Sequence, residues 1–309
     1  MRQGESALLE AEAASDVLEK ISHYTAAGGA FSSAGRVREA YKAMYASLQL
    51  AEKGSGLEAK QHFLLGRLTR DFSPSLSLRH YRAGHARLSV EPLTALVQSG
   101  DRGSAKAAAA TLSRTLLQEN SDSYSPYSPG ALYEHAGALA ASPEVTSEET
   151  IAFYLFTAVL SEASLLPSDA SRAWEGLRAT ADHFGKTGWA LEALLGRARL
   201  HAEVDSFSHQ ERETVILAAF IAALRVQDPV WCRSLMDVSH LSRDLTLSPR
   251  CTAIAEAVEA IGLGRAHGAR ALQDRLRLGH PMDREVLGVV CPAVEALLLR
   301  CDLGSVLRY

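Results

Sequence analysis

The stretch "HYTAAGGAFSSAGRVREAYKAMYASLQLAE", residues 23–52, is the most informative about the fold, because glycines interrupt an otherwise helical pattern. A glycine inside a helix costs about 1 kcal/mol relative to alanine, so each needs a structural reason. Gly28 lies among alanines, which allows a neighbouring helix to approach closely. Gly35 follows Phe31 by four residues, where a glycine that ends a helix is expected. The stretch predicts a helix, a glycine turn and a second helix, and leaves Gly29 unexplained.

Apolar residues recur at intervals of three and four through most of the chain, and no convincing strand pattern of period two occurs. The predicted helices are 5–22, 37–52, 57–70, 75–89, 104–120, 130–141, 147–165, 170–185, 188–204, 208–225, 229–240, 250–262, 265–277 and 283–301. Helices joined by such short turns lie antiparallel, and a long succession of them favours an α-solenoid. The predicted fold class is therefore all-α.

An internal repeat supports the solenoid. An apolar residue, a glycine four residues later and an alanine five after that occur at Phe31/Gly35/Ala40, Leu50/Gly54/Ala59, Leu96/Gly100/Ala105 and Phe184/Gly188/Ala193. The spacing of a tetratricopeptide repeat (TPR) occurs in Tyr24, Ala27, Gly28, Phe31, Ala40, Met44 and Ser47. A degenerate copy is Leu177, Ala181, Phe184, Gly188, Ala193, Arg197 and Leu200. These patterns predict a TPR-like solenoid.

The composition describes a soluble protein with an ample core: 309 residues, 47% of them hydrophobic. The net charge of −4 gives no overall reason to bind nucleic acid or an anionic membrane. Four widely spaced cysteines without a C-x-x-C pair indicate a reducing compartment rather than a zinc or disulfide framework. The acidic first twenty residues do not resemble a secretory signal, and no apolar run reaches the roughly 18 residues of a membrane span. We expect a cytoplasmic protein with peripheral membrane contact only.

No constellation of catalytic residues is readable. The eleven histidines include no H-E-x-x-H, and the sequence favours core or surface roles for them. The segment "GLGRAHG", 262–268, lacks a preceding strand, so we interpret it as a turn between helices rather than a dinucleotide loop. The sequence therefore predicts no enzyme activity, no metal and no cofactor, and leaves a helical enzyme as a minor alternative.

Two features leave alternatives open. The segment "NSDSYSPYSPGALYE", 120–134, favours an irregular connection over a phosphorylation switch at Ser125 or Ser128. Basic residues at turns and helix starts form either one face for an acidic helical partner or a mixed, solvated surface. They include Arg36, Arg38, Lys42, Arg102, Lys106, Arg114, Arg178, Arg197 and Arg199.

The order of these features resembles the soluble NSF attachment protein (SNAP) family, the gamma type more than the alpha type. The likeness covers nearly the whole chain and consists of residue classes in order. It is carried by "ALLEAEAASDVL" (7–18), the first repeat (24–52), "LYEHAGALAASPEVTSEETIAFYLFTAVLSEAS" (132–164) and "LSPRCTAIAEAVEAIG" (247–262). Met282 and Asp283 fall where the family has a Leu/Met-Asp pair before its terminal bundle.

The resemblance implies an adaptor with a solenoid over residues 1–225 and a C-terminal helical bundle over 226–309. Such proteins coat the four-helix SNARE bundle (syntaxin-type) and recruit the hexameric AAA ATPase NSF, which disassembles the bundle after membrane fusion. The implied setting is intracellular protein transport, such as ER–Golgi transport, at Golgi, vacuole or vesicle membranes. The implied SNARE contacts are Arg102, Lys106 and Arg197.

The chain departs from alpha-type members in two places. They carry a hydrophobic membrane loop where this chain has only "EKISH", residues 19–23. They end in an acidic run and a leucine that engages the ATPase, for which Asp302 and Leu307 are the nearest equivalents here. The resemblance therefore implies weaker ATPase stimulation or a different contact. An unrelated TPR scaffold, such as a chaperone cofactor or complex-assembly subunit, is the alternative function.

Overall fold

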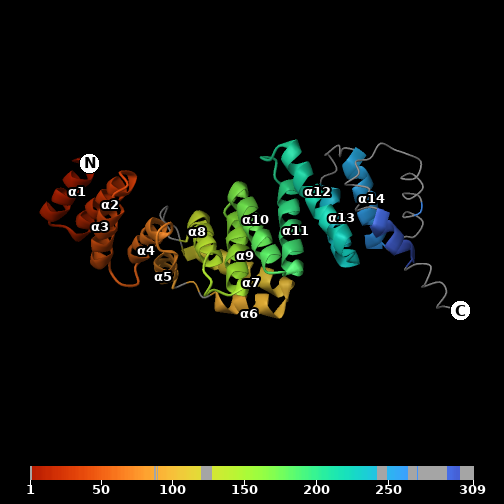
Figure 1. The fold of residues 1–309 in the computed structure, drawn as a ribbon, viewed down its shortest axis with the longest axis horizontal. Helices are drawn as coiled ribbons and strands as arrows, with labels where there is room; N and C mark the ends of the chain where they lie inside the picture. Colours follow the sequence, from red (N-terminus) through yellow and green to blue (C-terminus); the bar gives the residue numbers. More distant parts are fainter. Residues whose placement is uncertain are drawn as a thin grey trace. The chain divides into compact units, whose positions relative to one another are not determined.

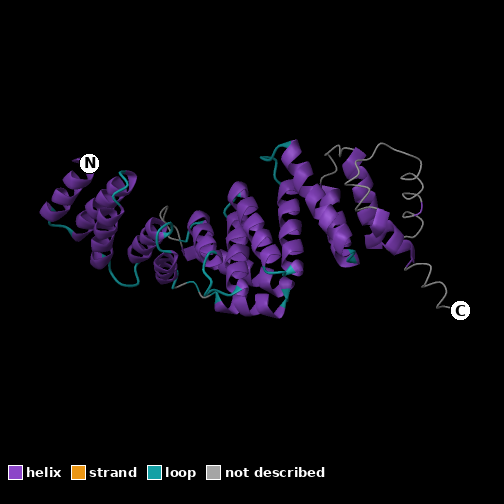
Figure 2. Cartoon of the chain, in the orientation of Figure 1, coloured by secondary structure: helices purple, strands orange, loops and turns teal. Residues whose placement is uncertain are grey.

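A computed structural model divides the chain into two compact units, Met1–Asp169 and Ala170–Tyr309. The structure describes residues 2–86, 88, 90–119, 127–241, 249–263, 270 and 291–299. Within these residues every regular element is a helix and no strand occurs (Figure 2). The all-α prediction is confirmed for this part of the chain, and contacts between neighbouring helices are compatible with an α-solenoid.

The helices are labelled in Figure 1. The first unit contains α1 (Arg2–Ala13), α2 (Val17–Ser33), α3 (Val37–Leu50), α4 (Gly56–Thr69), α5 (Pro74–Gly84), α6 (Glu91–Ser99), α7 (Arg102–Glu119), α8 (Pro129–Ala140) and α9 (Ser147–Ala163). The unit boundary falls inside α10 (Pro167–His183). The second unit continues with α11 (Thr187–Glu203), α12 (His209–Val226), α13 (Pro229–Leu241) and α14 (Pro249–Leu263), and residues 291–299 are also helical.

The predicted helices differ from the structure in several places; the helix expected over 75–89, for example, ends at Gly84. The helix expected over 5–22 is broken before Asp16, whose side chain accepts a hydrogen bond from the Glu19 N–H at 3.0 Å and so caps α2. Helix α6 was not predicted, although its buried Leu93 and Val97 have helical spacing. The helix expected over 265–277 lies outside the described residues except for position 270, and that over 283–301 is described only for 291–299.

Helices α2 and α3 form the antiparallel hairpin that the opening stretch predicts. Gly28 is buried, and a Cβ placed on it would lie 2.5 Å from the Met44 Cγ and 3.3 Å from the Ala40 carbonyl oxygen. At the other end of the hairpin, the Ser47 hydroxyl donates to the Ile21 carbonyl oxygen at 3.3 Å. Gly28 therefore permits the close approach of the two helices. Gly29 faces open space, which explains why the repeat assigns it no role.

Antiparallel hairpins recur in both units. In the first, Gly66 of α4 lies against the Tyr81 ring of α5. In the second, Gly196 of α11 lies against the Trp174 ring of α10. Among the described helices of the first unit, the regular succession is interrupted where α5 packs on α8, whereas α6 and α7 pack on α9 (Figure 1). The repeat copy Leu96/Gly100/Ala105 therefore belongs to the α6–α7 hairpin, which lies beside the series of hairpins and not within it.

The turn glycines have left-handed backbone conformations, as a helix-ending glycine should. Gly35 has a φ of 73°, and the Arg36 N–H donates to the Phe31 carbonyl oxygen at 2.9 Å. The fourth repeat copy was placed three residues too late, since Gly188 lies inside α11 and the left-handed residue is Gly185, with a φ of 66°. Position 190, five residues after Gly185, is again a buried alanine.

Leu165 occupies the same left-handed position in the turn after α9, with a φ of 56°. Its hydrogen bonds match those of the glycine turns: the Leu166 N–H donates to the Ser161 carbonyl oxygen at 2.9 Å. The side chain is 87% exposed, so packing does not compensate for the strain. The turn geometry is therefore set by the backbone hydrogen bonds and not by the residue type.

Each unit contains a buried apolar cluster. In the first unit, Ala27, Phe31 and Ala40 form one such cluster with Ala7 and Ala43. In the second, buried residues of α11 and α12 share a cluster with α13, α14 and residues 293–294. Residues on both sides of position 225, where the resemblance implied a domain boundary, share this core. The described helices include none long and apolar enough to cross a membrane.

Gly28 and its neighbour allow a matched test of the hairpin. Gly28→Ala is expected to lower the free energy of unfolding by about 1–3 kcal/mol, because the added methyl overpacks against Met44. Gly29→Ala is expected to raise it by up to about 1 kcal/mol, because the methyl enters open space on a helix. Urea unfolding of both variants measures the difference. Equal stability of the two variants would contradict the close approach.

Leu165→Gly is expected to stabilise the first unit by about 0.5–1 kcal/mol, because glycine adopts the left-handed conformation without strain and no buried contact is lost. Gly185→Ala is the reciprocal change, and is expected to destabilise by about 1 kcal/mol. Thermal unfolding compares both with the unaltered chain. A Leu165→Gly variant that unfolds more readily would show that Leu165 makes a stabilising contact.

Candidate functional site

Arg102 and Lys106, two predicted partner contacts, lie four residues apart at the start of α7 and so share one face of that helix. Both side chains are half-buried. Asp101 caps the helix, accepting a hydrogen bond from the Ser104 N–H at 3.0 Å. Because a helix N-terminus carries partial positive charge, cations there do not stabilise the helix. The charge of the helix terminus therefore does not account for these two basic residues, and both have interactions within the chain.

Arg197, the third predicted contact, lies on α11 in the second unit and is paired within the chain. Its guanidinium forms an ion pair with Glu175 of α10, and its Nε donates to the Ser171 hydroxyl at 3.0 Å. Glu175 also accepts a hydrogen bond from Arg178 at 2.6 Å. The structure thus places Arg197 in a network that joins α10 to α11. The spacing of Glu175 and Arg178 was readable from the sequence, but the pairing across helices was not.

The charge state of Glu175 follows from this network. Burial opposes its ionisation, but the hydrogen bonds and charges of Arg178 and Arg197 outweigh burial and lower its pKa. A carboxyl whose pKa is lowered by folding stabilises the protein at pH values above its pKa in the unfolded chain, about 4.5. That contribution is lost as the pH falls through its pKa in the folded chain. The connection between α10 and α11 is therefore intact at neutral pH.

A buried serine–histidine pair adjoins the network. The Ser171 hydroxyl lies 2.9 Å from the His201 Nε2, and burial lowers the pKa of His201 to about 4. Since Ser171 accepts from Arg197, its own proton is directed to the neutral imidazole. The His201 ring stacks on Phe207 at a centroid distance of 3.7 Å. A nucleophile must be reached by its substrate, and both side chains are buried, so the pair connects helices rather than performing catalysis.

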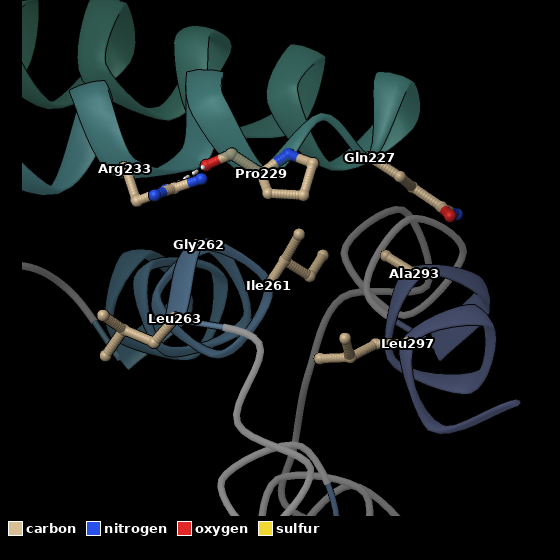
Figure 3. Close-up of a pocket in the computed structure, with 8 residues that line it drawn as sticks. All are labelled: Gln227, Pro229, Arg233, Ile261, Gly262, Leu263, Ala293 and Leu297. Atoms are coloured by element: carbon tan, nitrogen blue, oxygen red, sulfur yellow. Dashed lines mark hydrogen bonds between the residues drawn. The ribbon is translucent and has the colours of Figure 1, made fainter. Parts of the chain in front are cut away.

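The second unit contains a hollow of about 330 Å³ between the α12–α13 turn, the end of α14 and the helix over 291–299 (Figure 3). It is lined by Gln227, Pro229, Arg233, Ile261, Gly262, Leu263, Ala293 and Leu297. The Arg233 Nε donates to the Pro229 carbonyl oxygen at 3.3 Å, so its charge is held along its own helix (Figure 3). These eight residues include no carboxylate, imidazole or thiol. The hollow therefore offers neither an acid–base pair nor a set of metal ligands.

Two histidine pairs, which the sequence analysis did not detect, lie in the first unit. His62 and His80 approach with their Nδ1 atoms 3.1 Å apart, and His85 and His135 with theirs 2.8 Å apart. The members of each pair come from different helices, 18 residues apart in one pair and 50 in the other, so spacing within a helix gave no signal of them. Among the described residues no three histidine, cysteine, aspartate or glutamate side chains are grouped to hold a metal ion.

The remaining predicted contacts, Asp302 and Leu307, lie outside the described residues. Ser128, one of the two candidate phosphorylation sites, caps α8 by accepting a hydrogen bond from the Ala131 N–H at 3.4 Å. Its partner in that prediction, Ser125, lies outside the described residues. The structure therefore tests neither the ATPase contact nor the phosphorylation switch.

Comparison with known proteins finds no family model that matches this sequence and no curated protein that matches it. The resemblance to SNAP proteins therefore depends on the residues that carry it.

Arg197→Met keeps the apolar stem of the side chain but removes its charge and hydrogen bonds. We expect the free energy of unfolding to fall by about 1 kcal/mol at neutral pH, a modest value because Arg197 and Glu175 are 28% and 38% exposed. The difference should shrink below about pH 4.5, as Glu175 takes up a proton. Chemical unfolding at several pH values measures it. A loss of stability that does not depend on pH would contradict the ion pair.

Proposed function

We propose that this chain is an adaptor protein, a TPR-like α-solenoid that binds other proteins through the surfaces of its helix hairpins. The first candidate partner is the four-helix SNARE bundle (syntaxin-type), with recruitment of the ATPase NSF for SNARE disassembly in vesicle transport. The adaptor acts at the cytoplasmic face of endomembranes without catalytic activity of its own. The partner class comes from the sequence resemblance.

The observation that supports the proposal most strongly is the α2–α3 hairpin. TPR spacing requires a small residue where the first helix meets the second, and Gly28 is buried there against Met44 and Ala40. Phe31, at the next repeat position, is 2% exposed. Successive hairpins of this kind bury their shared faces and present the others to partners.

The binding surface that we propose centres on α7. Arg102 and Lys106 lie four residues apart on one face of this helix, and both side chains are half-buried. An acidic helical partner would supply the complementary charge. Arg197 has a different position in the proposal, because its guanidinium already pairs with Glu175. Reversing its charge would disturb α10 and α11 as well as any binding.

A second candidate, an unrelated TPR scaffold, is favoured by this internal pairing of Arg197, which removes one basic residue from the expected SNARE surface. Such a scaffold would bind another partner, for example a chaperone or the subunits of a complex. Binding experiments with defined partners distinguish the two candidates.

The double variant Arg102→Glu/Lys106→Glu tests the surface. We expect it to weaken binding to a purified, assembled SNARE bundle by at least about tenfold, because two attractions become repulsions. Titration of the labelled bundle with each protein measures affinity, and co-precipitation with NSF measures recruitment.

The matched control is Lys53→Glu/Arg225→Glu, which makes the same change in net charge at exposed positions outside the proposed surface. Circular dichroism checks that both proteins fold. Equal affinity of the two variants would remove Arg102 and Lys106 from the binding surface. Failure of the unaltered chain to bind either SNAREs or NSF would contradict the SNARE adaptor and leave the scaffold.

A further inference from the structure

Helix α5 is attached to its neighbours by imidazoles on two sides. His80 in α5 meets His62 of α4, with 3.1 Å between the Nδ1 atoms. His85, the residue that follows α5, meets His135 of α8 with 2.8 Å between the Nδ1 atoms. Tyr81 lies between the pairs in sequence, and its ring stacks on that of His135. Two pairs of titratable groups therefore hold one short helix.

Each pair depends on a single proton between its two nitrogens. At these distances one Nδ1 carries a hydrogen and donates it to the lone pair of the other. When both imidazoles of a pair are protonated, both Nδ1 atoms carry hydrogens, so two N–H groups and two positive charges face each other. The pair must then separate. The His85–His135 pair is the more buried, with the residues 3% and 1% exposed, so burial opposes positive charge on it.

The positive charge near the His85–His135 pair is partly neutralised by carboxylates. Arg82 of α5 raises the positive potential at His135, and its guanidinium pairs with Glu149 of α9 at 3.1 Å. Glu134 of α8 accepts a hydrogen bond from the Tyr81 hydroxyl at 3.2 Å and approaches Arg67 of α4 at 3.7 Å. The Tyr127 ring lies near His85, and Glu91 lines the adjoining hollow of about 230 Å³.

The surroundings of the His62–His80 pair are less acidic. The Tyr41 hydroxyl of α3 lies 3.4 Å from the His80 Nε2, and Arg79 adds positive potential at His80. Glu58 of α4 favours protonation of His62, but its carboxylate also accepts a hydrogen bond from the Gly54 N–H. Burial is the first cause of resistance to protonation in this pair.

We propose that the two histidine pairs form an acid-sensitive clasp: protons taken up from solvent break the Nδ1–Nδ1 hydrogen bonds and release α5 from α4 and α8. Release opens the first unit at α5 while α2 and α3 stay packed. The proposal concerns the stability of this unit and does not depend on the adaptor function.

The direction of the pH effect follows from burial. Burial lowers the pKa of His80 to about 4, lowers that of His62, and holds that of His135 well below its usual value. Below pH 6.5, the pKa of an exposed histidine, the released helix binds more protons than the packed helix. Stability is therefore fully present above about pH 6.5 and declines as the pH falls toward 4. Each proton taken up on opening raises the open fraction about tenfold per pH unit.

Amide hydrogen exchange of the full chain at about pH 7, 6 and 5, corrected for the intrinsic exchange rate, tests the clasp. We expect protection of α5 and α8 to fall at least about tenfold per pH unit below pH 6.5. Helix α2 is the internal reference, because its buried residues include no histidine, whereas α3 contacts His80 through Tyr41. The protection of α2 should change less. Unchanged protection of α5, or an equal loss in α2, would overturn the proposal.

His62→Gln provides a variant that keeps the hydrogen bond. The glutamine oxygen can accept from His80 but does not titrate, so the loss of protection in α5 with acid should become less steep. His183→Gln, at an exposed position of α10, is the matched control and should leave the profile unaltered. An unchanged slope in His62→Gln would show that the His62–His80 pair is not part of the clasp. If that variant does not fold, the pH profile of the unaltered chain still decides.

Discussion

The close approach of two helix backbones at a small residue is the constraint on which this structure depends. Where α2 meets α3, Gly28 leaves no room for a side chain beside Met44 and the Ala40 carbonyl. A similar close approach occurs between α5 and α4, where a Cβ on Gly84 would lie 3.0 Å from the Ala59 carbonyl oxygen. A glycine costs helix stability locally, but the contact that it permits lets two amphipathic helices bury a common face. The hairpin, rather than the single helix, is consequently the unit of stability.

Electrostatic interactions add connections between helices after this packing is made. The Arg197–Glu175 ion pair joins α10 to α11, and the His85–His135 hydrogen bond joins α5 to α8. Both depend on protonation, in opposite senses: Glu175 must lose its proton, whereas the accepting Nδ1 of the histidine pair must stay unprotonated. Both conditions hold near neutral pH. Basic residues that resemble a binding face in the sequence therefore include at least one, Arg197, that holds the fold together.

Local signals in the sequence predicted the fold well. Gly35 ends α2 in a left-handed backbone conformation, which glycine adopts without strain. The glycine itself therefore marks the turn in the sequence. Two kinds of feature were not predictable. Leu165 adopts the same conformation as Gly35 because backbone hydrogen bonds impose it, and a leucine gives no hint of this. The pairing of His85 with His135 joins residues fifty positions apart, so only the packing of α5 on α8 reveals it.

The double-mutant cycle between Gly28→Ala and Met44→Ala tests the central claim, that contact across the hairpin excludes a side chain at position 28. Shortening Met44 removes the atoms that an added methyl would meet. Gly28→Ala is expected to cost less in the Met44→Ala background than in the unaltered chain, by more than about 0.5 kcal/mol in the free energy of unfolding. The same cost in both backgrounds would contradict it.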